Sequence, residues 1–431
     1  MGEQSKSASV GWGSFRTRAG SRKGNERSTA LSQMHAEGRL LILCARTVVS
    51  EFARVEVEDL VSDGVQWDRV WQLSRAHGVA PLVYRNLLTI CPKAVPSATH
   101  QAFRRHNQAN VLLNTLLAKE LVMLIDALAA KGVRVIPFKG VALAQTAYGD
   151  IGLRECADID LIVEQEAVPQ ARKVLWSQGY QLTSRDTGKE EESEEPYHLF
   201  QKKNGIVAVD LQWNMVRQHF GFRLDRKELY GRLKPVGLPT KAVMGLTHED
   251  LLILLCIHGT KHVWEQLKWI CDVAELVRRR PALDWSRILF QAEEWSCRRV
   301  VLLGLGLAQT LFDTSLPALV LQEIELDRDI VSLLRRMPKH LLKNPAQGID
   351  ENCAEALYML VKDSSWERWK LGVELCRTES EVMTRCLPWF RYQSRLRIMS
   401  HCLKPVQRVV ARWILSVRMR EAIVRWLQSS G

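Results

Sequence analysis

The sequence lacks the features that mark secreted and membrane-spanning proteins. Its ten cysteines are scattered, with no C-x-x-C pair and no cluster of the kind that binds zinc. No apolar run reaches the roughly 18–20 residues that a bilayer-spanning helix needs, and the N-terminus has no uninterrupted apolar stretch of the signal-peptide type. These absences predict a soluble, cytoplasmic protein whose cysteines stay reduced.

The composition also lacks a strong bias, apart from an excess of positive charge. Hydrophobic residues make up 46% and charged residues 25% of the 431 residues, so most of the chain can bury a core in two or three domains. The net charge of +12 favours anionic partners such as nucleotides, nucleic acid or an acidic membrane surface. Charge alone does not choose among these partners.

The spacing of apolar residues divides the chain into five segments. We expect a disordered basic tail at 1–33, a helical region at 34–130 and an α/β core at 131–246, where the period shortens to that of strands. Helical spacing returns at 247–340 and continues through a C-terminal extension at 341–431. The sequence therefore predicts an α+β fold, in which a small mixed sheet is flanked by N-terminal helices and a helical C-terminal domain.

Within the core, short apolar runs alternate with helical patterns. We expect strands at 133–138, 158–163, 197–203 and 206–213, and helices at 141–148 and 167–178. Asn204-Gly205 is a strong hairpin signal, and the acidic run 186–195 is typical of a solvated loop. Thr247, with Asp250 three residues later, predicts the start of the first C-terminal helix.

Lys139 and Gly140 lie between the end of a predicted strand and the start of a predicted helix. Free backbone N–H groups and the helix dipole favour an anion at such a position. Gly140 lets the backbone approach closely, and the Lys139 ammonium adds charge. The pair is a candidate phosphate site, although Lys139 could also be a solvated lysine at the end of a strand.

Three aspartates follow this turn on predicted strands. Asp158 and Asp160 lie on one face of a strand, with Ile159 turned to the other. Two adjacent carboxylates repel each other unless a cation lies between them, and oxygen ligands suit Mg²⁺ or Mn²⁺. Asp210, on a later strand, could complete a metal triad or accept a proton from an attacking hydroxyl. A lone Asp-x-Asp is common, so its place after the Lys-Gly turn carries the argument.

These motifs together resemble a known family. The Lys-Gly pair, Tyr148, Arg154, Asp-Ile-Asp-Leu-Ile-Val, Gly179-Tyr180 and Val-Asp-Leu-Gln-Trp are similar to the uncharacterised bacterial nucleotidyltransferases of the DNA polymerase beta superfamily. The resemblance covers roughly residues 35 to 320. It includes the family's helical half, which the stretches 257–264 and 269–274 resemble. The chain departs from the superfamily at Phe-Lys-Gly, where hydrophobic-Gly-Gly/Ser is usual, and at Gln212, where a His is expected.

The resemblance implies a metal-dependent enzyme that moves a nucleoside monophosphate from an NTP to a hydroxyl and releases pyrophosphate. Asp158 and Asp160 would bind Mg²⁺ (or Mn²⁺), and Asp210 would serve as the third ligand or the base. The nucleotide would be held by a further set of residues, namely Lys139, Gly140, Arg154, His258, Lys261 and His262. The acceptor is unknown, and small-molecule, sugar and peptide hydroxyls all fit.

Plainer interpretations stand beside this one. His258 and His262 share a helix face and could bind zinc, but a satisfied pair of helix histidines is the better interpretation because no Glu follows His258. Trp264 and Trp269 are typical of a core. Asp272 is typical of a helix-surface or hydrogen-bonding residue. Arg154 could lie free in solvent.

Two other functions remain open at this point. A non-catalytic binding module could keep the fold and recruit a partner to a biosynthetic complex. An RNA-directed transferase would suit the positive charge, although no RNA-binding module is recognisable. The basic apolar stretch 406–427 could lie on an anionic membrane surface, but its spacing favours a helix that caps the C-terminal domain.

Overall fold

A computed structural model describes residues 34–183, 197–203, 205–213, 222–224, 226–238, 241–341, 357–358 and 360–363. The predicted tail, the acidic run 186–195, Asn204 of the predicted hairpin turn and the stretch 406–427 lie outside these residues. None of the described helices is long and apolar enough to cross a membrane.

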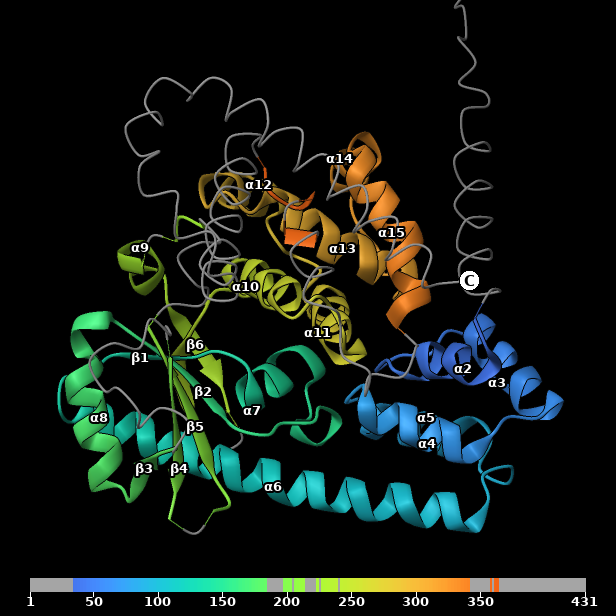
Figure 1. Ribbon diagram of the computed structural model, residues 1–431, viewed down its shortest axis with the longest axis horizontal. Coiled ribbons are helices and arrows are strands. Elements are labelled where there is room, and N and C mark those ends of the chain that lie inside the picture. Colours follow the sequence, from blue (N-terminus) through green and yellow to red (C-terminus); the bar gives the residue numbers. More distant parts are fainter. Residues whose placement is uncertain are drawn as a thin grey trace, which may run out of the picture.

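The N-terminal region is helical, as predicted. Its helices are α2 (Ala36–Cys44), α3 (Glu51–Asp63), α4 (Trp67–Ala76), α5 (Ala80–Ile90) and α6 (Ser97–Ala129). Helix α6 runs along the lower edge of the molecule in Figure 1, from the other N-terminal helices to the sheet. Its first half buries Phe103 among those helices, and its second half buries Leu121 and Leu128 beneath the sheet. One long helix therefore joins the two parts.

The sheet is mixed and small, which confirms the predicted fold class. It contains β1 (Val135–Pro137), β2 (Ile159–Val163), β3 (Tyr180–Leu182), β4 (Tyr197–Lys202) and β5 (Ala208–Gln212) in the order β1-β2-β5-β4-β3. Strands β2 and β5 are parallel, and the other pairs are antiparallel. The sequence predicted the other four but not β3, because the pairing of so short a segment, outside any longer apolar run, depends on its neighbours in space. A hairpin of β6 (Lys234–Gly237) and β7 (Ala242–Gly245) escaped prediction for the same reason.

The predicted helices of the core are present with altered geometry. The first begins as α7 (Gly140–Leu143) and continues as a π-helical turn, η1 (Ala144–Tyr148), before the 3₁₀ turn η2 (Ile151–Leu153). The second is α8 (Val168–Ser177), preceded by the 3₁₀ turn η3 (Gln165–Ala167). Both are short helices that connect strands, so they place the residues at strand ends.

Alternation along the strands separates a packed face from a polar one. On β2 and β5, Ile159, Leu161, Val209 and Leu211 are buried against α6 and α8. The residues between them point to the opposite face, and Ile162 on that face belongs to the core of the helical regions. Asp160 and Asp210 are therefore turned towards the C-terminal helices and away from the core beneath the sheet.

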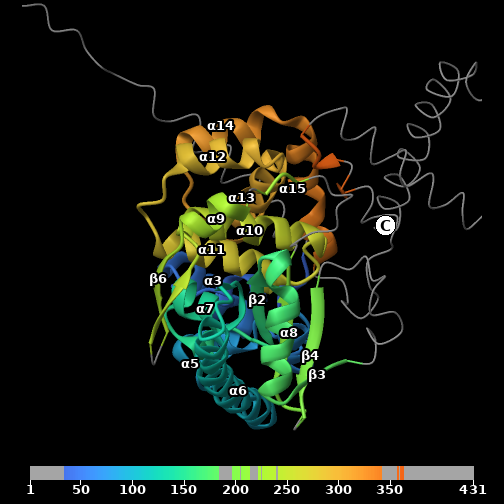
Figure 2. The ribbon, with the colours of Figure 1, turned by 90° about the vertical axis from the view of Figure 1, so that its left-hand side faces the viewer.

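The C-terminal region is again helical and forms the upper half of the molecule (Figures 1 and 2). Its helices are α9 (Arg226–Gly231), α10 (His248–Lys261), α11 (Leu267–Arg279), α12 (Trp285–Glu294), α13 (Arg298–Phe312), α14 (Ala318–Leu326) and α15 (Arg328–Leu341). The Thr247 hydroxyl accepts a hydrogen bond from the Asp250 N–H at 3.2 Å, which confirms the predicted start of α10.

Helices from both ends of the chain share one core. Leu40–Cys44 of α2 belongs to the same buried cluster as the apolar faces of α10, α11 and α13. Trp264 is completely buried in it, as predicted for a core tryptophan, and its ring lies where a Cβ at Gly259 would be. The predicted boundaries at 130, 246 and 340 stay predictions, but the helical regions on either side of the sheet segment are packed together.

Candidate active site

The Lys139–Gly140 turn is pressed against the start of β2. The Phe138 N–H donates to the Asp160 carbonyl at 3.2 Å, which continues the β1–β2 pairing up to the turn. Gly140 has φ +53°, and a Cβ there would lie 3.2 Å from the backbone carbonyl oxygen of Asp158. A side chain at this position would be both strained and crowded, so the turn requires glycine.

Strand register brings the three aspartates together. Asp160 of β2 lies directly opposite Asp210 of β5 in the parallel pair, and neighbouring strands are about 4.8 Å apart. Asp158 precedes β2 by one residue and is close enough to Asp160 for the charge of Asp160 to raise the pKa of Asp158. The sequence suggested that Asp210 could reach the other two, and the pairing of the strands is what places it there.

Two donors partly satisfy these carboxylates. The Lys139 ammonium lies 2.8 Å from Asp160 Oδ1. The Gln212 amide Nε2 donates to Asp160 Oδ1 at 3.2 Å and to Asp210 Oδ2 at 2.6 Å. Asp210 Oδ1 is buried and has no hydrogen-bond partner among the described residues. An unpaired buried carboxylate oxygen is costly, so this atom is the one most in need of a ligand.

The charge state of the aspartates reflects their crowding. Burial, together with the charge of the neighbouring Asp160, raises the pKa of Asp210 to about 7 against the opposing effect of Lys139. Burial and Asp160 likewise raise the pKa of Asp158 to about 6. In both cases burial is the larger cause and the like charge of Asp160 adds to it, so a cation bound between the carboxylates would favour their ionised forms.

The carboxylate oxygens of the three aspartates suit a divalent cation, but these side chains do not surround a position where one could bind. Carboxylate oxygens are the ligands that Mg²⁺ and Mn²⁺ prefer, and Asp210 Oδ1 is an unpaired ligand atom. Within the described part of the chain, however, no three His, Cys, Asp or Glu side chains form a group that could hold a metal ion. The Lys139 ammonium and the Gln212 amide occupy the carboxylate oxygens instead.

Aromatic side chains of α10 and α11 form a wall near the turn. The rings of Phe138 and His258 meet edge to face with centroids 6.2 Å apart, and His262 stacks on Trp269 at 4.9 Å. Lys261 extends its ammonium over the Tyr197 ring of β4, 5.6 Å from the centroid. The structure therefore places Lys261 and both histidines where the helices approach the sheet.

Both histidines are uncharged at neutral pH. Burial lowers the pKa of His258 well below its usual value, with Lys139 adding to the effect, and burial with Lys261 lowers the pKa of His262 to about 4. The two rings pack edge to face at 4.6 Å. Nearby positive charge disfavours another cation between them, which agrees with the prediction of satisfied helix histidines better than with zinc.

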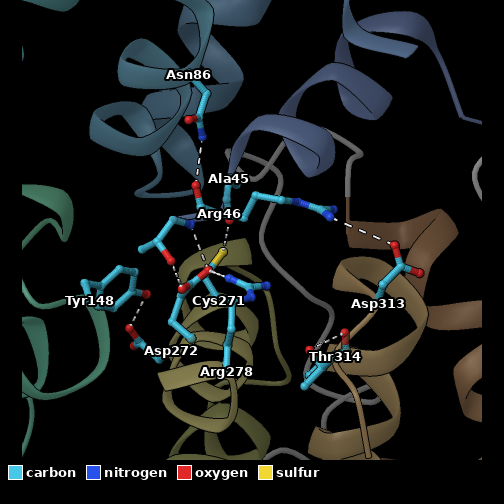
Figure 3. Close-up of polar contacts among 12 residues, drawn as sticks. Ala45, Arg46, Asn86, Tyr148, Cys271, Asp272, Arg278, Asp313 and Thr314 are labelled. Atoms are coloured by element: carbon cyan, nitrogen blue, oxygen red, sulfur yellow. Dashed lines mark hydrogen bonds and ion pairs between the residues drawn. The ribbon is translucent and has the colours of Figure 1, made fainter. Parts of the chain in front are cut away.

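Arg154 is engaged in a buried ion pair. Its Nε and Nη2 atoms contact the two carboxylate oxygens of Asp272 on α11 at 2.8 and 3.0 Å. The Tyr148 hydroxyl donates to Asp272 at 2.7 Å, as the close-up in Figure 3 shows for these two residues. Arg154 therefore does not lie free in solvent, and Asp272 is a buried hydrogen-bonding residue. The phosphate role of Arg154 stays a prediction, since its guanidinium already has a carboxylate partner.

Lys268, which sequence reasoning missed, also lies near the aspartates. It stands in the first turn of α11, where its backbone N–H donates to the His77 carbonyl at 3.1 Å. Burial lowers its pKa, with Arg154 adding to the effect, and its charge in turn acts on the pKa of Asp158. No local pattern marks it, because a helix brings it to the site from 110 residues beyond Asp158.

Asp160 and Asp210 on adjacent strands, Asp158 just before β2, and a Lys-Gly turn that opens a helix form an arrangement that suits a protein of the nucleotidyltransferase class. The chain belongs to the uncharacterised nucleotidyltransferase family, whose model matches residues 63–313. The match runs from the end of α3 to the end of α13 and includes the whole sheet. A search of curated proteins finds no match to the chain. The protein is therefore a nucleotidyltransferase with an acceptor still to be found.

Proposed function

We propose that this protein transfers a nucleoside monophosphate from an NTP to a hydroxyl group in a metal-dependent reaction that releases pyrophosphate. The register of Asp160 opposite Asp210, with Asp158 beside the Lys139–Gly140 turn, is the observation that supports it best. Nucleotidyl transfer needs carboxylates that hold cations against phosphate oxygens, and backbone donors where the triphosphate lies. Both kinds of group occur together here.

Asp158 and Asp160 are the proposed ligands of Mg²⁺ or Mn²⁺, with Asp210 as third ligand or general base. A bound cation would supply positive charge to the phosphate oxygens. The raised pKa of Asp210, about 7, suits a group that accepts a proton from an attacking hydroxyl near neutral pH. Its unpaired Oδ1 is available for either role.

Lys139 is proposed to exchange its ion-pair partner, Asp160, for a phosphate oxygen when the nucleotide binds. Without a ligand its ammonium neutralises Asp160. An incoming triphosphate offers competing oxygens at the turn, where Gly140 keeps the backbone open. If the Lys139 ammonium moves to a phosphate oxygen, Asp160 becomes free to bind the cation. Before a nucleotide binds, the carboxylates are paired with Lys139 and Gln212 instead.

The wall of α10 and α11 is the proposed nucleotide-facing side of the site. His258 and His262 are neutral, and Lys261 carries charge close to them. Neutral imidazoles both donate and accept hydrogen bonds, and Lys261 can reach a phosphate or ribose oxygen. The packing of His262 on Trp269 holds the imidazole in place.

The acceptor is proposed to be a hydroxyl of a small molecule, a sugar or a peptide. RNA ranks lower: the charge of +12 suits it, yet no RNA-binding module is recognisable in the sequence. A non-catalytic binding module ranks lower still, because neighbouring carboxylates with raised pKa values destabilise a protein that binds no cation. The reducing cytoplasm is the expected compartment.

Thermal unfolding of the wild type and Asp160→Asn, with each of the four NTPs and with or without Mg²⁺, tests the proposal. A ligand that binds only the folded state raises its stability by mass action. We expect one or more NTPs to raise the melting temperature in the presence of Mg²⁺, and Asp160→Asn to abolish that rise. Asp126→Asn is the matched control, since Asp126 is exposed on α6.

Each outcome decides between the functions. A magnesium-dependent rise that persists in Asp160→Asn would contradict the assigned site. No rise with any NTP would favour the binding module. A rise that is lost in Asp160→Asn but kept in Asp126→Asn identifies the donor nucleotide, and pyrophosphate release with candidate acceptors then tests transfer directly.

A further inference from the structure

A second group of basic residues lines a cavity at the other end of α11. The cavity has a volume of about 260 Å³. Its walls include Arg279, the last residue of α11, and Arg280, its C-cap, as well as His248 at the start of α10 and Thr146 of the π-helical turn η1. Strand β6 closes the remaining side.

The two arginines lack carboxylate partners among the described residues, which distinguishes them from Arg278 beside them. Arg278 forms an ion pair with Glu275. The Arg280 side chain makes one described hydrogen bond, from Nη2 to the Thr146 carbonyl at 3.3 Å, and its buried Nε has no described partner. The Arg279 guanidinium lies against the backbone of Gly149, 2.5 Å from where a Cβ would be.

Neighbouring charges confirm that positive charge is concentrated here. Burial lowers the pKa of Arg280, and the adjacent Arg279 adds to the effect. Burial lowers the pKa of His248, with Arg280 contributing, while Glu249 opposes the shift only in part. The cavity wall thus holds two arginines at close range, neither of them ion-paired with a carboxylate among the described residues, an arrangement that an anion would stabilise.

We infer that this cavity binds the phosphate group of a small phosphorylated molecule. The guanidinium groups of Arg279 and Arg280 present paired N–H donors that match phosphate oxygens, and a dianion balances two arginines where a carboxylate balances one. The volume lies just below the range of about 300–1,000 Å³ typical of ligand sites. It suits a small ligand, of which the phosphate enters the cavity.

The phosphate site is distinct from the carboxylates. Arg280 follows Lys268 by 12 positions on or next to α11, which corresponds to about 18 Å at 1.5 Å per residue. One phosphate group cannot contact both ends. A simpler function of the arginines, to complement the carbonyl ends of α11 and η1, accounts for Arg279 but leaves the buried Nε of Arg280 unsatisfied.

Thermal unfolding of the full chain in sodium phosphate and in sodium chloride at equal ionic strength tests the inference. We expect phosphate to raise the melting temperature of the wild type more than chloride does. The combined Arg279→Gln and Arg280→Gln variant should lose that difference. Lys139→Gln, at the proposed nucleotide site, and Arg105→Gln, at an exposed position on α6, should keep it.

Three results would overturn the inference. They are an equal effect of phosphate and chloride on the wild type, a phosphate effect that is undiminished in the double variant, and a phosphate effect that is lost in Lys139→Gln alone. Should the double variant fail to fold by circular dichroism, Arg280→Lys replaces it, because it keeps the charge but removes the paired donors. Calorimetric titration with inorganic phosphate should then show weaker binding than in the wild type, and unchanged binding would refute the site.

Discussion

Asp272 and Asp210 are both carboxylates of the region between the sheet and the C-terminal helices, but their surroundings differ. Asp272 has two bonds from Arg154 and one from Tyr148. Asp210 has one described hydrogen bond, from Gln212, and a buried oxygen without a described partner. The first is a structural carboxylate whose charge is balanced, and the second has capacity left for a ligand. Asp272 is also the more deeply buried of the two, so its balanced charge follows from the number of its donors and not from contact with solvent.

The pKa values follow the same division. Burial opposes the charge of Arg154, but Asp272, Cys156 and Tyr148 together outweigh it and raise the pKa of Arg154 well above its usual value. At the other cluster burial and like charge act in the same direction and raise the pKa of Asp210 to about 7. The ion pair thus holds η1 and the loop before β2 against α11, while the aspartates store unfavourable charge that a cation can relieve.

The largest effect is expected at the balanced pair. Asp272→Leu leaves the buried Arg154 guanidinium without its carboxylate, so the free energy of unfolding should fall by about 3–5 kcal/mol. Urea denaturation measures the change. Adding Arg154→Met should recover most of the loss, because both charges are then absent. A double variant as unstable as Asp272→Leu would show that the cost does not come from the unpaired guanidinium.

At the crowded carboxylates we expect a substitution to stabilise the protein rather than destabilise it. In metal-free protein at pH 8, Asp210→Asn should raise the free energy of unfolding by about 1–3 kcal/mol, since each pKa unit is worth about 1.4 kcal/mol and solvent screens part of the shift. The variant should lose stabilisation by Mg²⁺ and NTP. Asp126→Asn is the control, and a destabilised Asp210→Asn would mean that Asp210 is balanced after all.

The pH dependence of the free energy of unfolding should differ between the wild type and Asp210→Asn. The folded state holds the Asp210 proton up to a pKa of about 7, against a usual value of 3.8. The folded state therefore binds more protons in this window, and its stability falls as pH rises from about 4 to about 7. Metal-free Asp210→Asn should show a shallower fall in urea denaturation across these pH values. Identical slopes would refute the raised pKa.

A smaller effect is expected at the turn beside the aspartates. Gly140→Ala forces a side chain to adopt φ +53° within 3.2 Å of the Asp158 carbonyl, and we expect a loss of about 1–3 kcal/mol in the free energy of unfolding. Gly132→Ala is the matched control, since Gly132 has φ +74° but open space around its Cβ position. Equal losses in thermal unfolding would show that crowding against β2 contributes nothing.

The smallest effect is expected where an ion pair lies in solvent. Lys241 and Asp126 are both about half exposed, so Lys241→Ala should change the free energy of unfolding by less than about 1 kcal/mol. Urea denaturation at low and high salt measures this. A loss comparable to that of Asp272→Leu would remove the distinction between buried and exposed pairs on which the comparison rests.

Much of the fold was predictable because it follows from local periodicity. The runs around Ile159 and Val209 alternate as strands that bury one face, and Thr247 with Asp250 marks a helix start that the structure confirms. The three-residue β3 and the β6–β7 hairpin were not predictable, since their pairing depends on neighbours in space.

By itself the sequence determined the chemistry available at the site: a glycine at the turn, carboxylates on alternate strand positions, and a lysine beside them. Chain order and side-chain type are enough for this, because alternation along a strand is a local property. Only the tertiary structure decided which charges are balanced. The register that sets Asp210 opposite Asp160, the capture of Arg154 by Asp272, and the approach of Lys268 all depend on contacts between segments far apart in the chain.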